Sequence, residues 1–322
     1  MTRVYAPSRL HFGLLSVLPA VRDTRPESLP LRNYGGVGLM IHEPGITVAA
    51  EPAAAWSAEG PLAERALAYA RSIAESGTRI VPCRLQIESC PPEHVGLGVG
   101  TQLGLAVARA VTATAGLSLN SHALATLVGR GERSGIGIHG FEQGGCLIDL
   151  GKPTTATIAP SVLRIDWPAD WWLVLAQPRI PGPWAGQRER LAFSRTRPVE
   201  TMMRLSERLC RLVLLGLIPA LIERDWKNFG QSLKEYNRLA GEPFALEQGG
   251  NYATPKVAML IEQIQRFGVS GAGQSSWGPT VFAVCQDAEQ ADRLIRYLES
   301  IDVSDLVVFK TSVCANGSRV EA

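Results

Sequence analysis

A glycine-rich segment in the first half of the chain has the spacing of an anion-binding loop. The run Gly96–Gln102 reads Gly-Leu-Gly-Val-Gly-Thr-Gln and leads directly into a segment rich in alanine and leucine. At a helix N-terminus the first N–H groups have no partner within the helix and the dipole is positive, so phosphate or diphosphate is the natural ligand. The run is not a Walker loop, which needs Gly-Lys-Ser/Thr, and not a convincing Rossmann turn. A tight turn before a helix is the structural alternative.

A later glycine-rich run, Ser270–Thr280, surrounds polar and aromatic side chains with small residues. Its glycines allow backbone N–H groups to converge on a ligand oxygen. Ser275 and Ser276 can donate further hydrogen bonds, and Trp277 can stack on an aromatic ring. The run therefore indicates a loop that approaches a ligand closely, and a buried tryptophan beside a turn is the alternative.

Strand and helix patterns alternate on both sides of these loops, and they must position them. We expect an opening strand with an embedded turn over Val4–Leu15, then a glycine-punctuated hairpin over 35–41 and 46–48. Further strands are expected over Arg84–Glu88, Cys146–Asp149, Trp171–Ala176, Thr280–Cys285 and Leu306–Lys310. Helices are expected over Pro61–Glu75, Thr101–Ala115, Ser121–Leu127, Thr201–Leu217, Pro219–Leu239, Thr254–Phe267 and Ala288–Ser300.

The composition favours a small-molecule ligand. The chain has 32 basic and 30 acidic residues without a basic block or acidic tail, so its charge provides no footprint for nucleic acid or for a membrane. The six cysteines form no Cys-x-x-Cys pair and no zinc-site spacing, which indicates reduced thiols. The opening segment Met1–Leu10 has no apolar core of signal-peptide length, and the longest apolar stretch, Leu212–Ile222, is interrupted by Gly216 and Pro219. We therefore expect a cytoplasmic protein.

The two glycine loops resemble the second and third motifs of the GHMP kinase superfamily, and Ala6–Gly13 stands where that superfamily has its first motif. Within the superfamily, four variants resemble the β-ribofuranosylaminobenzene 5′-phosphate synthase family. These variants are Arg9–Gly13, Gly96–Leu103, Arg133–Gly137 and Gly273–Thr280. The resemblance covers most of the chain.

This resemblance implies a fold and an activity. The fold is α+β, a GHMP-kinase-like two-domain fold with a ribosomal S5 domain 2-like N-terminal domain over 1–168 and a ferredoxin-like C-terminal domain over 169–322. The activity joins phosphoribosyl diphosphate to 4-aminobenzoate and releases carbon dioxide and diphosphate, toward a tetrahydromethanopterin-type one-carbon cofactor. Mg²⁺ would accompany the diphosphate. Departure of diphosphate builds oxocarbenium character, so the reaction needs positioning and charge neutralisation more than a strong nucleophile.

Two departures separate this chain from the kinases of the superfamily. Where kinases have a catalytic aspartate after Ser-Gly-x, Ser134–His139 reads Ser-Gly-Ile-Gly-Ile-His. In addition, Val99–Thr101 replaces the small-hydroxyl run that kinases use beside the nucleotide phosphates. ATP-dependent phosphorylation is thereby disfavoured. Two alternatives stay open: a small-molecule kinase that uses another carboxylate, and a non-catalytic sensor of a phosphorylated metabolite.

The resemblance places Arg9, His11 and Arg133 near the reacting groups as candidate catalytic residues. A satisfied strand histidine is the alternative for His11. Arg130 and Arg133 are candidates for binding a phosphate or the aminobenzoate carboxylate. Substrate and phosphate contacts are expected from Gly96, Gly98, Gly100, Thr101, Gln102, Arg130, Ser134, Gly271, Gly273, Gln274, Ser275, Ser276 and Trp277.

No metal ligand is chosen among Glu132, Glu142 and Asp149, because Mg²⁺ often keeps waters and substrate phosphates as its principal ligands. His94 and His139 are weaker candidates for ligand contact, since each stands in a glycine-rich context where it can also face water.

The segment 177–189 is rich in proline and glycine and contains Arg179, Trp184 and Glu189. It is compatible with a lid or an aminobenzoate wall, and equally with an interdomain connection. Apolar residues over Met202–Leu217 are compatible with a homodimer interface.

Overall fold

The computed structural model describes residues 1–17, 32–153, 155–160, 162–180, 191–193 and 198–321. Its strands are β1 (Thr2–Ser16), β2 (Arg32–Pro52), β3 (Ser57–Glu59), β4 (Cys83–Ser89), β5 (Cys146–Asp149), β6 (Lys152–Pro153), β7 (Val162–Ile165), β8 (Trp172–Pro178), β9 (Ala272–Gln274), β10 (Val281–Cys285), β11 (Leu306–Thr311) and β12 (Arg319–Glu321). Its helices are α1 (Ala63–Glu75), α2 (Val99–Thr114), α3 (Ser121–Leu127), α4 (Ile136–Gln143), α6 (Val199–Leu212), the π-helical η1 (Val213–Leu217), α7 (Ile218–Ile222), α8 (Trp226–Gly241), the 3-10 turn η2 (Glu242–Phe244), α9 (Ala245–Gln248), α10 (Pro255–Arg266) and α11 (Ala288–Ser300).

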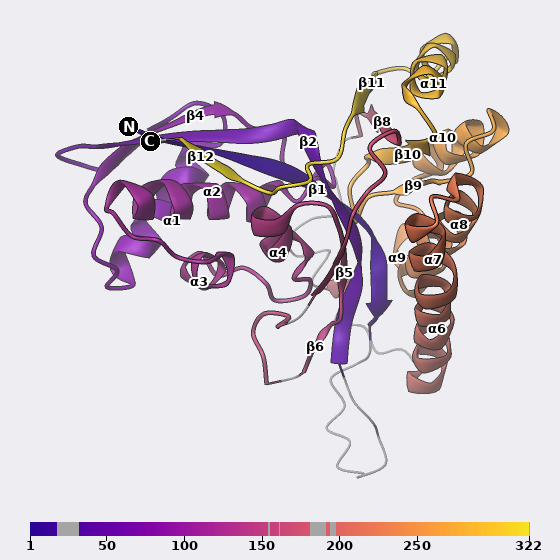
Figure 1. The fold of residues 1–322 in the computed structure, drawn as a ribbon, viewed down its shortest axis with the longest axis horizontal. Helices are drawn as coiled ribbons and strands as arrows, with labels where there is room; N and C mark the ends of the chain where they lie inside the picture. Colours follow the sequence, from indigo (N-terminus) through magenta and orange to yellow (C-terminus); the bar gives the residue numbers. More distant parts are fainter. Residues whose placement is uncertain (18–31, 154, 161, 181–190, 194–197, 322) are drawn as a thin grey trace.

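The first sheet is built around two long antiparallel strands, β1 and β2 (Figure 1). Its order is β12-β1-β2-β4-β3, with β5 and β6 paired to β2 and β7 paired to β5. Helices α1 to α4 lie on one side of this sheet (Figure 1). The loop before α2 meets β1 directly, because the backbone N–H of Arg9 donates to the carbonyl oxygen of Leu97 at 3.0 Å.

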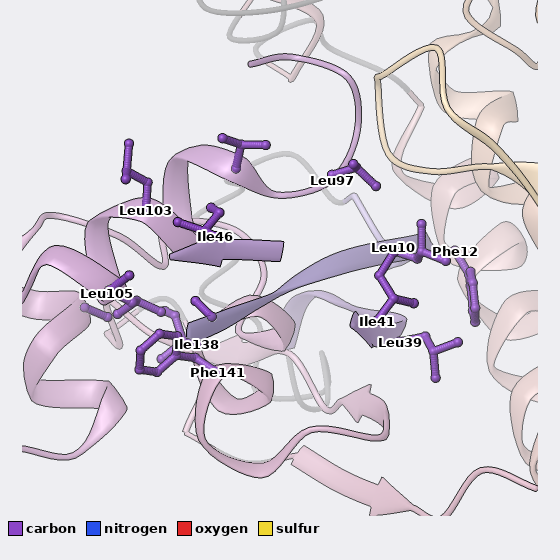
Figure 2. Packing of buried hydrophobic residues seen from close by; sticks show 14 of the residues in the cluster. Leu10, Phe12, Leu39, Ile41, Ile46, Leu97, Leu103, Leu105, Ile138 and Phe141 are labelled. Atoms are coloured by element: carbon purple, nitrogen blue, oxygen red, sulfur yellow. The ribbon is translucent and has the colours of Figure 1, made fainter. Parts of the chain in front are cut away.

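Buried aliphatic and aromatic side chains from β1, β2, α2 and α4 form the core of this layer (Figure 2). Leu10 and Phe12 of β1 are at most 1% exposed. Burying one such side chain contributes roughly 1.5–3 kcal/mol, so β1 is held firmly. Because side chains alternate along a strand, this packing directs Arg9 and His11 to the opposite face of β1.

The hairpin expected over 35–41 and 46–48 is wrong. Both segments belong to the single strand β2, which pairs antiparallel with β1 on either side of an irregularity. The register on β1 shifts between Ala6 and Ser8, opposite residues 42–45 of β2. The segment predicted as a turn is therefore a bulge, because β1 is long enough to pair with both flanking segments.

The second sheet is antiparallel with the order β11-β8-β10-β9. Helices α10 and α11 pack on it through a separate cluster that includes Val257, Ile264 and Leu294. Helix α8 joins this layer to β1. The Tyr236 hydroxyl of α8 donates to the carbonyl oxygen of Gly13 at 2.7 Å, so the part of β1 that carries Gly13 is bound by the C-terminal half of the chain.

The last strand returns to the first sheet, where β12 pairs with β1 and places Glu321 opposite Arg3. The two chain termini consequently lie side by side (Figure 1). Pairing with β12 covers part of the outer edge of β1, whose N–H and C=O groups would otherwise be unpaired. The division between domains at residue 168 remains a prediction, and the strand pairing adds that residues 319–321 lie with the N-terminal sheet.

Two helical segments differ from the expected ones. The break expected between Leu217 and Pro219 is absent, and the chain stays helical as far as Ile222. Helix α8 then begins after Asp225, whose side chain accepts a hydrogen bond from the N–H of Asn228 at 3.0 Å. The glycine-dense segment 135–145 contains α4. No helix in the described residues is long and apolar enough to cross a membrane.

Candidate active site

A cavity of about 540 Å³ opens where β1, the loop before α2, the segment 129–134 and the loop after β9 meet. This volume lies within the range of roughly 300–1,000 Å³ that is typical of small-molecule sites. The predicted residues on its wall are Arg9, His11, Gly96, Gly98, Gly100, Thr101, Arg130, Arg133, Ser134, Gln274, Ser276 and Trp277. The fold thus brings motifs from both halves of the chain to one cavity.

The loop before α2 and the first turn of that helix pass close to their neighbours at three glycines. Gly96 has φ +93°, and a Cβ there would overlap the backbone of the loop after β9. A Cβ at Gly98 would lie 3.1 Å from Nε of Arg9, and one at Gly100 would lie 2.7 Å from Nη2 of Arg65. The loop therefore extends from the loop after β9, past the motif in β1, to α1.

Two arginines converge on the first turn of α2. The Tyr69 hydroxyl donates to the carbonyl oxygen of Gly100 at 2.9 Å. It accepts hydrogen bonds from Nη2 of Arg130 and, at 3.2 Å, from Nε of Arg65. Arg65 also forms an ion pair with Glu93. Two guanidinium groups and the positive end of the helix dipole make this end of the cavity suitable for a phosphate or diphosphate.

Sequence reasoning did not single out Arg65 or Tyr69. They lie one helical turn apart on α1 and belong to none of the motifs. The signal that could have found them is weak, since a cation and a hydroxyl at i and i+4 on a helix usually face solvent.

His11 is 5% exposed, and hydrogen bonds hold both its backbone and its ring. Its N–H donates to Oγ of Ser275 at 3.0 Å, and its carbonyl oxygen accepts from the N–H of Ser276 at 3.0 Å. Nε2 of the ring lies 3.2 Å from Oγ of Ser134. Burial, together with the nearby charge of Arg9, lowers the pKa of His11 well below its usual value. The imidazole is therefore neutral at physiological pH and can accept a proton or donate a hydrogen bond.

Asp149, at the end of β5, is buried on the other side of Ser134. One carboxylate oxygen accepts from the N–H of Gly135 at 2.6 Å and lies 3.4 Å from Oγ of Ser134, while the other accepts from the N–H of Gly151 at 2.9 Å. Burial raises the pKa of Asp149, and these hydrogen bonds act against that increase. Ser134 thus stands between a neutral imidazole and a buried carboxyl group.

The described residues contain no group of three or more His, Cys, Asp or Glu side chains that could hold a metal ion. Of the acidic candidates considered from sequence, Glu132 lines the cavity, and Asp149 is used by backbone N–H groups. Glu142 lies elsewhere and accepts from the N–H of Ser121 at 2.9 Å.

Three residues of the third motif predicted to contact the ligand instead hold the protein together. Ser275 is fully buried, and its Oγ donates to the carbonyl oxygen of Gly96 at 2.7 Å. Gly271 packs on Gly230 of α8, and a Cβ at Gly273 would overlap the side chain of Asn237. Their small size allows the loop to dock on its neighbours, so none of the three lines the cavity.

Two glutamines are likewise occupied within the protein. Gln102 is fully buried in α2 and does not line the cavity, because its Nε2 donates to the carbonyl oxygen of Gly137 at 2.7 Å. Gln274 lines the cavity, but its Oε1 accepts from the N–H of Ala253 and its Nε2 donates to the carbonyl oxygen of Ser276, both at 2.7 Å. Gln274 therefore shapes the loop that carries Trp277.

An aromatic cluster forms another part of the cavity wall. The ring centroids of Phe244 and Trp277 are 4.4 Å apart, and the Phe193 ring lies 5.1 Å from Phe244 and 5.8 Å from Trp277. The guanidinium of Arg133 lies over Phe193, 4.5 Å from its centroid. Sequence reasoning identified Trp277 and Arg133 but missed both phenylalanines, which lie far from each other in sequence and in no motif.

The remaining candidates have different outcomes. His94 lines the cavity with φ +63°. His139 does not line the cavity, and its Nε2 lies 2.8 Å from the carbonyl oxygen of Ala159. The backbone of Arg179 is bound to the turn before β11. Trp184 and Glu189 lie outside the described residues.

Comparison with known proteins decides the family. The model of the GHMP kinases N terminal domain matches residues 62–146, and that of the GHMP kinases C terminal matches residues 217–302. A beta-ribofuranosylphenol 5'-phosphate synthase of Archaeoglobus fulgidus is 34% identical over 299 residues, which cover 88% of each chain. The chain belongs to this synthase family. A synthase of the same name from Methanothermobacter thermautotrophicus is 32% identical over 309 residues, again with 88% of each chain covered. The family consists of synthases, so this member is an enzyme.

Solved structures share the fold at low sequence identity. A putative homoserine kinase of Listeria monocytogenes matches with a TM-score of 0.69 and 17% identity over 100% of both chains. A mevalonate diphosphate decarboxylase of Staphylococcus aureus matches with a TM-score of 0.65 and 13% identity, over 100% of this chain and 99% of that chain. The predicted GHMP-kinase-like α+β fold of this synthase family member is thereby confirmed.

Proposed function

We propose that this enzyme transfers the phosphoribosyl group of phosphoribosyl diphosphate to 4-aminobenzoate and releases carbon dioxide and diphosphate. The product is β-ribofuranosylaminobenzene 5′-phosphate, an intermediate in tetrahydromethanopterin biosynthesis. One observation carries the proposal: the arginine pair at the start of α2, the neutral His11 and the aromatic cluster around Trp277 face one cavity. Family membership supports it, because the relatives are named for a ribofuranosylphenol phosphate product.

The proposed reaction balances without an oxidant or a reductant. The bond between ribose C1 and a diphosphate oxygen breaks, and its electron pair leaves with diphosphate. The ring carbon that bears the carboxylate forms the new bond to C1, with electron density supplied by the para amino group. The bond between the ring and the carboxylate then breaks, carbon dioxide leaves, and the electron pair restores aromaticity.

The residues of the cavity suit this charge distribution. Arg65 and Arg130, with the first turn of α2, stabilise the charge that develops on the leaving diphosphate. An imidazolium beside the ribose would oppose positive charge at C1. Burial keeps His11 neutral, so its ring can contact the substrate without this penalty.

We propose that Mg²⁺ binds together with the diphosphate. Among the described residues no three-ligand cluster is present, and Glu93, on the cavity wall, is paired with Arg65. This donor set fits an ion held mainly by substrate phosphates and water, with Glu132 as the carboxylate available from the wall. When bound, Mg²⁺ would neutralise charge on the diphosphate.

The names of the relatives favour 4-hydroxybenzoate as a second acceptor, since a ribofuranosylphenol would be formed from it. A phenol supplies electron density best after losing its proton, whereas an aromatic amine needs no such loss. The hydrogen-bonded pair of His11 and Ser134 offers an acceptor for that proton.

The proposal is tested by mixing the purified enzyme with Mg²⁺, phosphoribosyl diphosphate and carboxyl-labelled 4-aminobenzoate or 4-hydroxybenzoate. Labelled carbon dioxide and ribosylated product are expected in equal amounts, and ATP with a small alcohol is the control for a kinase. Release of labelled carbon dioxide from 4-hydroxybenzoate but not from 4-aminobenzoate would make 4-hydroxybenzoate the acceptor in place of 4-aminobenzoate. Binding of phosphoribosyl diphosphate without release from either acid would reject the transferase and favour a sensor.

A further inference from the structure

The cavity has two chemically different ends, and the loop before α2 extends from one to the other. At Gly96 this loop packs on the loop after β9, which carries Trp277. At Gly100 a Cβ would lie 2.7 Å from Nη2 of Arg65 and 3.5 Å from Nη2 of Arg130. The aromatic cluster and the arginine pair therefore lie at opposite ends of the same loop.

We propose that Arg133, Phe193, Phe244 and Trp277 form an acceptor subsite for the ring and carboxylate of an aromatic acid, separate from the diphosphate site at the start of α2. The class of this acid rests on the proposed function. The subsite assigns different ligands to two arginines that sequence reasoning left equivalent.

The three rings pack edge to face and form one aromatic part of the cavity wall. Their interplanar angles are 63° between Phe244 and Trp277, 65° between Phe193 and Phe244, and 64° between Phe193 and Trp277. In such tilted contacts the edge of one ring meets the face of another, so the rings fix one another's orientation. Ser276, with φ +55°, turns the backbone immediately before Trp277, and all three rings line the cavity. Such a wall favours an aromatic ligand, whose ring can add a further edge-to-face or offset-stacked contact.

Arg133 adds the charge that an aromatic acid requires. Its guanidinium carbon lies 4.5 Å from the centroid of the Phe193 ring, a cation–π contact that restricts where the guanidinium can lie. A planar guanidinium in a fixed orientation matches a carboxylate in a bidentate contact. Holding the carboxylate against Arg133 would fix which ring carbon is presented to the ribose.

Arg130 differs from Arg133 although only three residues separate them. Its Nη2 is bonded to the Tyr69 hydroxyl, which donates to the carbonyl oxygen of Gly100. Its guanidinium lies 5.5 Å from the centroid of the Tyr69 ring. Arg130 is thus part of the helix-terminus site, whereas Arg133 is part of the aromatic cluster.

The test compares Arg133→Gln with the matched variant Arg130→Gln by calorimetry. Benzoate is the acceptor probe, because it lacks the amino group and does not react, and diphosphate with Mg²⁺ is the other probe. Loss of a charge-assisted contact is expected to weaken binding about 10-fold or more. Arg133→Gln should therefore weaken benzoate and leave diphosphate within about 2-fold, and Arg130→Gln should do the reverse. Phe193→Leu, which keeps Arg133, should also weaken benzoate selectively.

The outcomes separate the subsite from the function. Unchanged benzoate affinity in both Arg133→Gln and Phe193→Leu, or an equal loss of diphosphate affinity in the two arginine variants, overturns the subsite. Absence of benzoate binding to the wild-type enzyme, with or without diphosphate, overturns it as well. Selective loss of benzoate binding in an enzyme that releases no carbon dioxide supports the subsite and rejects only the proposed function. Unfolding curves identify any variant that has lost its fold, and Arg133→Lys then takes the place of Arg133→Gln.

Discussion

At the scale of single residues, burial shifts the pKa values of the two groups that flank Ser134. It lowers the pKa of His11 and raises that of Asp149, so each is shifted toward its uncharged form. The two differ in their partners. His11 faces the cavity, whereas Asp149 accepts hydrogen bonds from two backbone N–H groups and thereby fixes the segment that carries Ser134.

The depressed pKa of His11 makes stability depend on pH. Below about pH 6.5 the histidine of the unfolded chain binds a proton that the folded protein excludes, so acid favours unfolding. We expect the stability contributed by neutral His11 to be complete above that pH and to fall with acidification, by at most about 1.4 kcal/mol per pH unit. This contribution is measured by urea unfolding of the wild type and of His11→Gln between pH 7 and pH 5. If the free energy of unfolding changed with pH in the same way in both proteins, the prediction would be contradicted.

Replacing Asp149 by Asn retains the shape of the side chain but substitutes an NH₂ group for one acceptor oxygen. One of the N–H groups of Gly135 and Gly151 then loses its partner, and we expect a loss of about 2 kcal/mol in the free energy of unfolding. We also expect kcat to fall more than KM changes, because Ser134 and the His11 ring would move. The exposed Glu132→Gln is the control for stability. An Asp149→Asn enzyme with wild-type stability and kcat would show that the carboxylate has no positioning role.

At the scale of elements, the start of α2 is built by backbone contacts that side chains would block. At Gly96 the loop is in close contact with a backbone, whereas at Gly100 the first turn of α2 contacts the end of the Arg65 side chain. The same element therefore combines a structural and a ligand-binding position four residues apart.

This difference predicts opposite effects for two alanine substitutions. Gly96→Ala places a Cβ against the backbone of the loop after β9 at φ +93°, and we expect a loss of about 2 kcal/mol or more in stability. Gly100→Ala lies in the first turn of a helix, where alanine is favourable, and displaces only Arg65. We expect its stability to stay within about 1 kcal/mol of wild type while diphosphate affinity falls about 10-fold. Thermal unfolding and calorimetry distinguish the two variants, and equal destabilisation would refute the distinction.

At the scale of the whole molecule, β1 connects the two halves of the chain. It pairs within the first sheet, its carbonyl oxygens at Phe12 and Gly13 accept hydrogen bonds from α8, and its backbone at His11 is bound by the loop after β9. We therefore expect a change in packing between the halves to affect the residues that face the cavity.

The side chain of Ser275 bonds to two segments of the N-terminal half, namely β1 at His11 and the loop before α2 at Gly96. Ser275→Ala removes the acceptor of the His11 N–H and the donor to the carbonyl oxygen of Gly96. We expect a loss of about 2 kcal/mol in stability, because the buried N–H of His11 and the partly buried carbonyl oxygen of Gly96 each lose a partner. We also expect a rise in KM for both substrates. Ser304→Ala on the surface is the control. Wild-type KM values in Ser275→Ala would argue against coupling between this joint and the cavity.

We propose that the enzyme is a homodimer, with exposed apolar side chains of η1 and α7 at the interface. Leu214, Leu215 and Ile222 are 59–66% exposed, which is unusual for neighbouring large aliphatic side chains on a water-facing surface. Light scattering should give twice the mass of the chain, and Leu215→Glu should reduce it to the monomer. A monomeric wild type would reject the proposal.

Local sequence was sufficient for most of the elements, whereas the chemistry of the motifs stays a prediction. Helical spacing predicted α1, α2, α3, α10 and α11, because one apolar face per 3.6 residues is a property of the segment itself. Alternating glycines before α2 predicted an anion site, because helix termini always present unpaired N–H groups. The resemblance of the three motifs was enough for the family and the fold class.

Only the tertiary structure decided which groups share the cavity and which side chains hold the protein together. Arg65 and Phe244 reach the cavity from elements without motifs, and Ser275 and Gln102 turn out to be bound within the protein. The hairpin prediction failed for a similar reason. The two segments of β2 do not pair with each other, because β1 is long enough to pair with both of them. Sequence periodicity records which face of an element is apolar, but the direction of a polar side chain depends on neighbours that the fold brings from far along the chain.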